Sequence, residues 1–275
     1  MCSSDLDRCE IFWNRSGMSA LDKLFESPGK KLIGYLPAGY PTVANAREVI
    51  SAMVEGGVDA IEVGFPYSDP VMDGPTIQAA ADKSLANGTS ARDVMETLEH
   101  AANLAPSVIM TYWNPIERYG VSDFARDLAN AGGSGTITPD LTVEEAQIWL
   151  GACKENAINP IFVVAPSSND ERLQKVVNSA GGFVYAASLM GVTGARNQIS
   201  DAAEALVNRV RKFTKLPVCV GLGVSNATQA ESVAKYADGV IVGSAFINAL
   251  NSASEFKSGV IAVNKLAKEL KAGIA

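Results

Sequence analysis

One apolar stretch of the sequence contains a carboxylate, and two more carboxylates follow in the adjoining loop. The stretch IEVGFPYSDPVMDGPT covers residues 61–76, and Glu62 stands in it between apolar neighbours. Asp69 and Asp73 follow in a segment rich in proline and glycine. A carboxylate at the mouth of a buried strand has a raised pKa, which suits general acid and base catalysis. We therefore predict that Glu62 transfers protons.

The two aspartates allow simpler structural interpretations. Asp73 precedes Gly74-Pro75-Thr76, so it either faces the same site as Glu62 or caps a helix that begins there. The residues alone favour neither interpretation. For Asp69, in a Ser-Asp-Pro sequence, a turn is the favoured interpretation. An interior salt bridge is the structural alternative for Glu62, but its own strand supplies no cation.

Histidine chemistry is almost excluded by composition. His100 is the single histidine, and it lies within the helical stretch DVMETLEHAANL. A surface or half-buried helix residue is the favoured interpretation of it. Carboxylates and tyrosines are then the groups left for proton transfer. Tyr112 lies near the end of an apolar run, where it can line a site, and Tyr185 is interpreted as a core residue whose hydroxyl lies at the rim of the pocket.

The elements that must position these residues are short apolar runs alternating with helical patterns. Eight runs are each followed by a helix, and their continuous apolar character is typical of parallel strands covered on both faces. Eight such units in about 250 residues predict a single-domain (β/α)8 barrel over residues 18–275. A doubly wound open sheet is the alternative fold. Residues 1–17 show no periodicity and are predicted to be a disordered or non-native tail.

Helix starts can also be predicted. Residues 19–27, SALDKLFES, form a short amphipathic pattern with Ser19 as its N-cap, suited to covering the bottom of the barrel. Thr142 with Glu145, and Ser168 with Glu171, have the spacing of capping boxes that open helices.

Small residues follow the last strands of the predicted barrel. Gly221 and Gly223 precede one helix, and Gly243 and Ser244 open another. Glycine lets a backbone approach a ligand, and helix N-termini offer free N–H groups to an anion. Phosphate sites in these barrels commonly use the loops after strands 7 and 8. We therefore expect phosphate binding there.

Charge and hydropathy exclude other classes. The net charge of −7 and pI near 4.9 disfavour a nucleic-acid-binding surface. No apolar run is long enough to span a membrane. An acidic N-terminal stretch and four scattered cysteines predict a cytoplasmic protein with reduced thiols.

Together these stretches resemble the tryptophan synthase alpha-chain family. GFPYSDPVMDGPTIQ resembles the signature around its catalytic glutamate, and PAGYPT, TYWNPIERYG, GVTGARN, CVGLGVS and IVGSAF occur in the family's order. The resemblance implies a retro-aldol lyase that cleaves indole-3-glycerol phosphate to indole and glyceraldehyde 3-phosphate without a metal or an organic cofactor. It also implies a partner, a pyridoxal-phosphate beta chain, in an αββα complex that passes indole through a tunnel.

The resemblance also implies roles for individual residues. Glu62 would be the acid–base group, Asp73 would hold the indole N–H, and Tyr185 would line the site beside Glu62. The loop with Thr193 would act as a lid, and segments 66–73 and 112–119, with Asp69 and Asn114, would face the beta chain. The implied substrate and phosphate contacts are Tyr112, Thr193, Gly194, Gly221, Gly223, Gly243 and Ser244.

Two rival functions need consideration. Another phosphate-binding barrel enzyme would usually carry a catalytic lysine on a strand or a well-placed histidine, and no strand here carries a lysine in its core. A non-catalytic barrel that only stimulates the beta chain is the second rival. The presence of both Glu62 and Asp73 argues against it.

Overall fold

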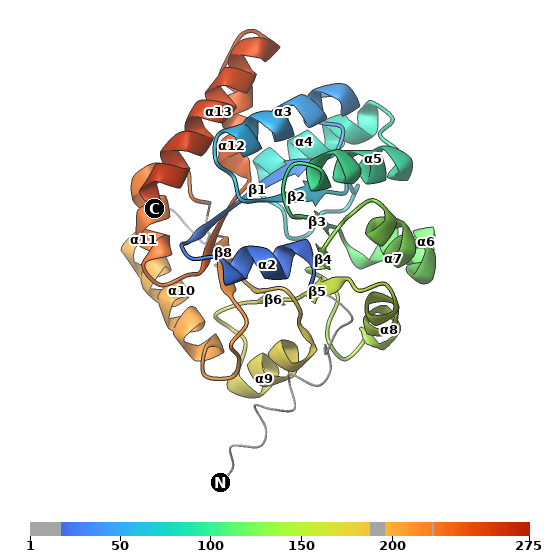
Figure 1. Ribbon diagram of the computed structural model, residues 1–275, viewed down its shortest axis with the longest axis vertical. Helices are drawn as coiled ribbons and strands as arrows, with labels where there is room; N and C mark the ends of the chain where they lie inside the picture. The colour runs from blue at the N-terminus through green and yellow to red at the C-terminus, as the bar shows by residue number, and fades with distance from the viewer. Residues whose placement is uncertain (1–17, 188–195, 222) are drawn as a thin grey trace.

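The strands of the computed structural model form one parallel sheet that curves into a barrel (Figure 1). The structure describes residues 18–187, 196–221 and 223–275, so the predicted tail lies outside the described residues. The sheet order is β5-β4-β3-β2-β1-β9-β8-β7-β6. The strands are β1 (Lys31–Pro37), β2 (Ala60–Gly64), β3 (Ser107–Met110), β4 (Gly135–Ile137), β5 (Asn159–Ile161), β6 (Val163–Val164), β7 (Val184–Ala187), β8 (Val218–Gly221) and β9 (Gly239–Val242).

The barrel closes through the chain itself. β5 and β6 stand at opposite ends of the sheet order, yet only Phe162 separates them in the sequence. They are the two halves of the predicted fifth strand, so all eight predicted strands are present. The (β/α)8 barrel is confirmed, and the doubly wound sheet is not observed.

Helices surround the sheet (Figure 1). No helix among the described residues is both long enough and apolar enough to cross a membrane. The helices are α2 (Ala20–Glu26), α3 (Val43–Glu55), α4 (Pro75–Ala86), α5 (Ala91–Ala102), α6 (Trp113–Tyr119), α7 (Val121–Asn130), α8 (Gln147–Glu155), α9 (Asp170–Ser179), α10 (Arg196–Val210), α11 (Ala227–Ala234), α12 (Ser244–Asn251) and α13 (Phe256–Gly273).

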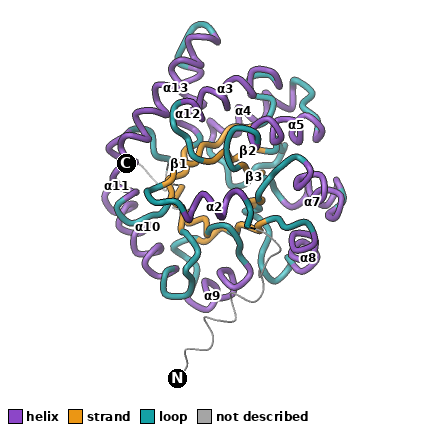
Figure 2. Tube along the Cα trace, viewed as in Figure 1, coloured by secondary structure: helices purple, strands orange, loops and turns teal. Residues whose placement is uncertain are grey.

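Alternation along each strand separates two apolar cores. On β2, Ile61 and Val63 pack outward against the helices, whereas Ala60 packs inward. Helix α2 lies across the ring of strands and closes it at the end where the strands begin (Figure 2). The inner core joins Leu21 of α2 to one residue from each strand region: Ile33, Ala60, Val108, Ile137, Ile161, Phe183, Cys219 and Ile241.

The predicted closing helix is confirmed in detail. The Ser19 hydroxyl accepts a hydrogen bond from the Asp22 N–H at 3.2 Å, and the Asp22 carboxylate accepts one from the Ser19 N–H at 2.9 Å. The Asn159 side-chain amide donates to the Ser19 hydroxyl at 3.0 Å, which ties the helix start to β5. Burial of Leu21, which is fully shielded from solvent, stabilises this closure by roughly 1.5–3 kcal/mol.

Two predicted helix starts are wrong. Thr142 and Glu145 bond side chain to side chain, and the Glu145 N–H reaches back only three residues to the Thr142 carbonyl. That bond closes an isolated turn, and α8 begins at Gln147. The start of α9 is displaced by one residue, because Asn169 accepts from the Arg172 N–H at 2.9 Å and is the true N-cap.

Candidate active site

Glu62 lies on the inward face of β2. It alternates with Ile61 and Val63, and its side chain is only 1% exposed. In the parallel ladder its Cα is paired with that of Tyr35 on β1. Burial, with a smaller contribution from the charge of Asp73, raises the pKa of Glu62 to about 8. Its Oε2 atom has no hydrogen-bond partner within the described residues. Glu62 can therefore carry a proton at neutral pH and release it to a bound molecule.

Asp73 lies in the loop between β2 and α4, close enough to Glu62 for their charges to interact. It does not cap α4, because Gly74 is the N-cap residue and no side chain in the described part of the chain caps that helix. Burial raises the pKa of Asp73 to about 6, opposed by a hydrogen bond from the Tyr112 hydroxyl. Asp73 is therefore largely ionised at neutral pH, whereas Glu62 is largely protonated.

Tyr112 connects the loop to the end of β3. Its hydroxyl accepts a hydrogen bond from the Met72 N–H at 2.9 Å and donates to Asp73. The residue is the N-cap of α6, a short helix that the sequence pattern does not predict. Asp140, after β4, accepts from the Trp113 N–H at 2.9 and 3.1 Å. This bond fixes the start of α6 and with it the place of Tyr112.

Tyr185 faces the same interior from β7. Burial and then the charge of Glu62 raise the pKa of its hydroxyl well above the usual value, so the hydroxyl remains protonated. A Cβ added at Gly221 on the neighbouring strand would collide with the Tyr185 hydroxyl and would lie 2.9 Å from its Cζ. Gly221 therefore makes room for Tyr185, a role that its sequence position in a glycine-rich loop does not reveal.

Tyr35 is a site residue that sequence reasoning missed. It lies on β1, is 6% exposed, and has a hydroxyl pKa raised by burial and then by the charges of Asp73 and Glu62. In the sequence it is one apolar residue of KLIGYLP, with no neighbouring signal. Its cross-strand pairing with Glu62 is the property that places it in the site, and pairing is visible only in the folded barrel.

The two predicted phosphate helices differ at their starts. At α11, the Asn226 side chain accepts from the Gln229 N–H, and the Ser225 N–H donates to the Gln229 side chain at 2.8 Å. At α12, Gly243 is the N-cap, and no side chain of the described residues caps the first turn. Helix α12 therefore offers the freer N–H groups. Gly223 adopts a left-handed φ of 65°, which favours glycine.

The remaining predicted residues lie farther out or outside the described part. Asp69 and Asn114 are both exposed. Thr193 and Gly194 lie outside the described residues. His100 lies on α5 against α3, with its Nε2 atom 3.0 Å from the Ser51 hydroxyl, in agreement with the structural interpretation made from the sequence.

Fold and site together define a class of protein. The barrel brings two carboxylates with separated pKa values, and three buried or half-buried phenols, to the end of the strands where (β/α)8 enzymes carry out their chemistry. Pairs of carboxyl groups with separated pKa values are typical of acid–base catalysis. The chain is a (β/α)8 barrel enzyme.

Comparison with known proteins identifies the family. The family model for the tryptophan synthase alpha chain matches residues 21–275. The chain is 55% identical over 247 residues to a tryptophan synthase alpha chain of Thermobifida fusca, covering 88% of this chain and 92% of that protein. The chain belongs to the tryptophan synthase alpha-chain family. It is a lyase that cleaves indole-3-glycerol phosphate in tryptophan biosynthesis, and its family works with a beta chain.

Solved structures agree. A Mycobacterium tuberculosis tryptophan synthase structure superposes with a TM-score of 0.87 and 50% identity, covering 94% of this chain and 99% of that one. A tryptophan synthase alpha subunit from Legionella pneumophila gives a TM-score of 0.85 at 32% identity, with 94% of this chain and 99% of that one covered.

Proposed function

We propose that Glu62 and Asp73 divide the chemistry of indole-3-glycerol phosphate cleavage between them. Glu62, protonated at neutral pH, gives its proton to C3 of the indole ring. Asp73, ionised, accepts the indole N–H and stabilises the positive charge that protonation creates. The observation that carries the proposal is that the barrel brings together a buried carboxyl group, Glu62, and a half-buried one, Asp73, with separated pKa values of about 8 and about 6.

The second half of the reaction uses the same groups. Once Glu62 has lost its proton, its carboxylate accepts the proton of the glycerol hydroxyl next to the ring. The carbon–carbon bond then breaks, its electron pair returns to the indole, and the hydroxyl-bearing carbon becomes the aldehyde of glyceraldehyde 3-phosphate. Tyr185 and Tyr112 line the space in which this occurs. The steps balance within the protein and substrate alone.

The phosphate group is proposed to bind at the start of α12, with Gly243 and Ser244, and to be approached by Gly223. The uncapped first turn of α12 supports this placement, since free N–H groups and the helix dipole both favour an anion. Thr193 and Gly194 are proposed to complete the phosphate site and its lid. Gly221 contributes by leaving space for Tyr185 rather than by contacting the phosphate directly.

The partner surface is proposed to surround the loop that carries Asp73. Asp69 and Asn114 are exposed there, and the apolar side chains of Val71 and Met72 are 78% and 51% exposed. An apolar loop tip is suited to burial against another subunit. We propose a pyridoxal-phosphate beta chain as the partner, in a cytoplasmic αββα complex that receives the indole. No cofactor is assigned to the alpha chain itself.

The substitution Glu62→Gln tests the acid–base role proposed for Glu62. We expect indole release, measured with and without an added beta chain, to fall by about 10²–10⁴-fold. Glycerol phosphate affinity, measured by calorimetry, should remain unchanged. Turnover like that of the original protein would remove Glu62 from the mechanism. An original chain that releases no indole, yet stimulates the beta chain, would instead favour the non-catalytic alternative.

The phosphate site has a separate test, Ser244→Asp. An acidic residue in the first turn suits a helix, so folding should be retained. The added charge should repel the phosphate and weaken glycerol phosphate binding by at least tenfold. Asn226→Asp is the matched control, because it adds the same charge at the start of α11. Equal losses in both variants would contradict the assignment to α12.

A further inference from the structure

The side chain of Tyr35 extends across the interior of the barrel, from Gly243 to Gly64. At one end, a Cβ added at Gly243 would lie 3.1 Å from Cδ1 and 3.3 Å from Cβ of Tyr35. At the other end, a Cβ added at Gly64 would lie 2.7 Å from Cζ and 2.8 Å from Cε2, and nearer still to the hydroxyl. The side chain therefore reaches from the proposed phosphate helix to the strand that carries Glu62.

The hydroxyl end of Tyr35 lies in the layer above Glu62. Glu62 and Gly64 are two residues apart on β2, so they share the inward face of the strand. Because Gly64 has no side chain, the Tyr35 hydroxyl occupies the space that one would fill. This space lies on the way from Glu62 to the loop that follows β2, and that loop carries Asp73.

The Tyr35 hydroxyl has no hydrogen bond within the described part of the chain, although the residue is more than nine-tenths buried. The hydroxyl is therefore free to donate a hydrogen bond to an acceptor in the site. Two carboxylates raise the pKa of this hydroxyl through their charges, and Asp73 has a larger effect than Glu62. Both are acceptors when ionised.

We propose that the Tyr35 hydroxyl is a second phenol donor to the Asp73 carboxylate, beside Tyr112, and holds that carboxylate ionised and in place during catalysis. Tyr35 is thus a positioning residue, since it acts through Asp73. The inference rests on the proposed function, in which Asp73 must be negatively charged. The described titratable groups around Asp73 are Glu62 from β2, Tyr112 from the end of β3, Tyr35 from β1 and Tyr185 from β7.

The direction of the effect follows from the donor. A hydrogen bond to a carboxylate stabilises its charged form and lowers its pKa. Without the Tyr35 hydroxyl, the pKa of Asp73 in the working enzyme should rise, and less of the enzyme should be active on the acidic side. Loss of one such bond is expected to move the acidic limb of kcat/KM upward by about one pH unit, which is about tenfold in rate below that limb.

The experiment is Tyr35→Phe in the full chain, with kcat/KM for indole release measured across pH. Phenylalanine keeps the ring against Gly243 and Gly64, so the fold and glycerol phosphate binding should be retained. Tyr40→Phe is the matched control, because the Tyr40 hydroxyl donates to Asn251 on α12 at 2.7 Å and not to the site. We expect the acidic limb to shift in Tyr35→Phe alone.

Gly64→Ala gives a second measurement if Tyr35→Phe does not fold, because its methyl group displaces the hydroxyl without removing it. An unchanged acidic limb in a folded Tyr35→Phe, or in Gly64→Ala if only that variant folds, would overturn the inference. Its failure is distinguishable from that of the proposed function. If Asp73→Asn loses turnover while Tyr35→Phe keeps the normal pH profile, only the role of Tyr35 is wrong.

Discussion

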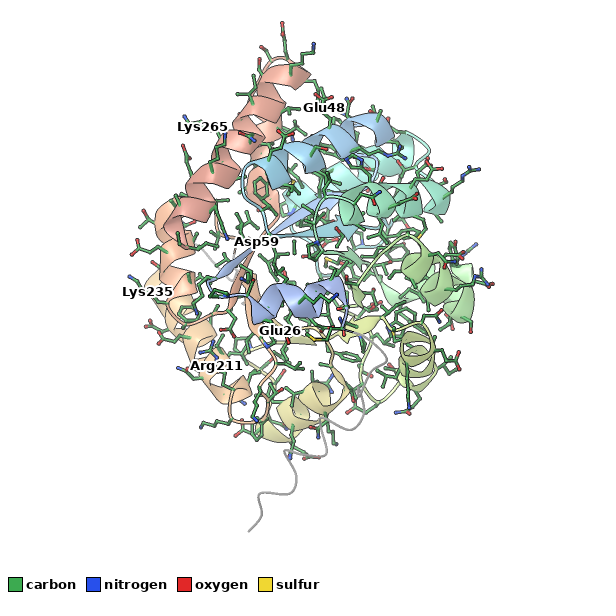
Figure 3. All side chains as sticks on the ribbon, viewed as in Figure 1. Glu26, Glu48, Asp59, Arg211, Lys235 and Lys265 are labelled. Carbon is green, nitrogen blue, oxygen red and sulfur yellow. The ribbon has the colours of Figure 1, made fainter. Side chains whose placement is uncertain are left out.

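Two carboxylates three residues apart, Asp59 immediately before β2 and Glu62 in the middle of it, meet opposite conditions. Asp59 accepts a hydrogen bond from the Leu32 N–H at 2.7 Å and pairs with Lys271 at 2.6 Å. Glu62, by contrast, is almost fully buried and has an Oε2 atom without a partner in the described residues. Asp59, labelled in Figure 3, belongs to the closed end of the barrel, whereas Glu62 faces the open end.

Other charged side chains near the starts of the strands have hydrogen-bond or ion-pair partners, as Asp59 does. Asp238 accepts from the Val218 N–H at 3.0 Å and from Arg211 at 2.8 Å. Lys31 is buried but donates to the Ser27 and Pro28 carbonyls, each at 3.0 Å. The hollow beside α2, lined in part by Lys30, Lys215 and Asp238, lies at this same end. These paired charges support the fold, whereas the unpartnered Oε2 atom of Glu62 towards the other end is available to a substrate.

Substitutions can test this contrast between the two ends of the barrel. The largest effect is expected from Asp73→Asn, which should lose most of its turnover. The change removes a charge but keeps the shape and an acceptor. Removing an electrostatic stabiliser from such a site costs on the order of 10²–10³ in rate. The melting temperature should be unchanged, because Gly74 and not Asp73 is the N-cap of α4. An unchanged kcat in a folded Asp73→Asn variant would show that catalysis does not depend on the negative charge of Asp73.

A second effect is the dependence of stability on pH. Glu62 has a pKa of about 8 in the folded chain against 4.5 when unfolded. Between these values folding takes up a proton, so stability present at low pH is lost as pH rises towards 8 and above. The loss attributable to Glu62 is on the order of several kcal/mol. Denaturant unfolding should show Glu62→Gln gaining stability over the original protein as pH rises from 5 to 9. A constant difference would contradict the raised pKa.

The smallest effect is expected at the closed end, from Asp59→Asn. This change breaks the pair with Lys271, whose side chain is 34% exposed, so water offsets part of the loss. Unfolding free energy should fall by about 1–2 kcal/mol, with kcat for indole release unchanged. Glu48→Gln, on the exposed face of α3 (Figure 3), is the control and should change little. Lost turnover with retained stability in Asp59→Asn would break the comparison.

The sequence predicts the fold well because each barrel unit leaves a local signal. Apolar runs mark the strands, and Ser19 with its periodic neighbours marks α2 correctly. Helix starts were less reliable, because Thr142 has the residues of a capping box but closes only a turn. Short helix α6 lacks a side-chain cap of its own, and its start is held by Asp140 from another loop. Such a contact cannot be read from local spacing.

The candidate site was predictable only where a residue type is unusual for its place. Glu62 is conspicuous because a carboxylate interrupts an apolar run. Tyr35 is not, since tyrosine is ordinary in a strand and its role depends on pairing with β2 and on the missing side chains of Gly64 and Gly243. The different capping of α11 and α12 also depends on side-chain orientation. The roles of Glu62, Asp73 and the phosphate residues stay predictions, which the substitutions described above test.

The position of α2 has a consequence for the order in which the chain folds. This helix is the first described element to be synthesised, but its docking partners are distant: Asn159 lies 140 residues beyond Ser19, and Phe183 packs with Leu21 and Phe25. At typical synthesis rates these partners appear roughly 10–30 s after α2. Contacts of such long sequence separation form slowly. The barrel is therefore closed at its base by a segment that must wait, with its apolar face uncovered, until most of the ring exists.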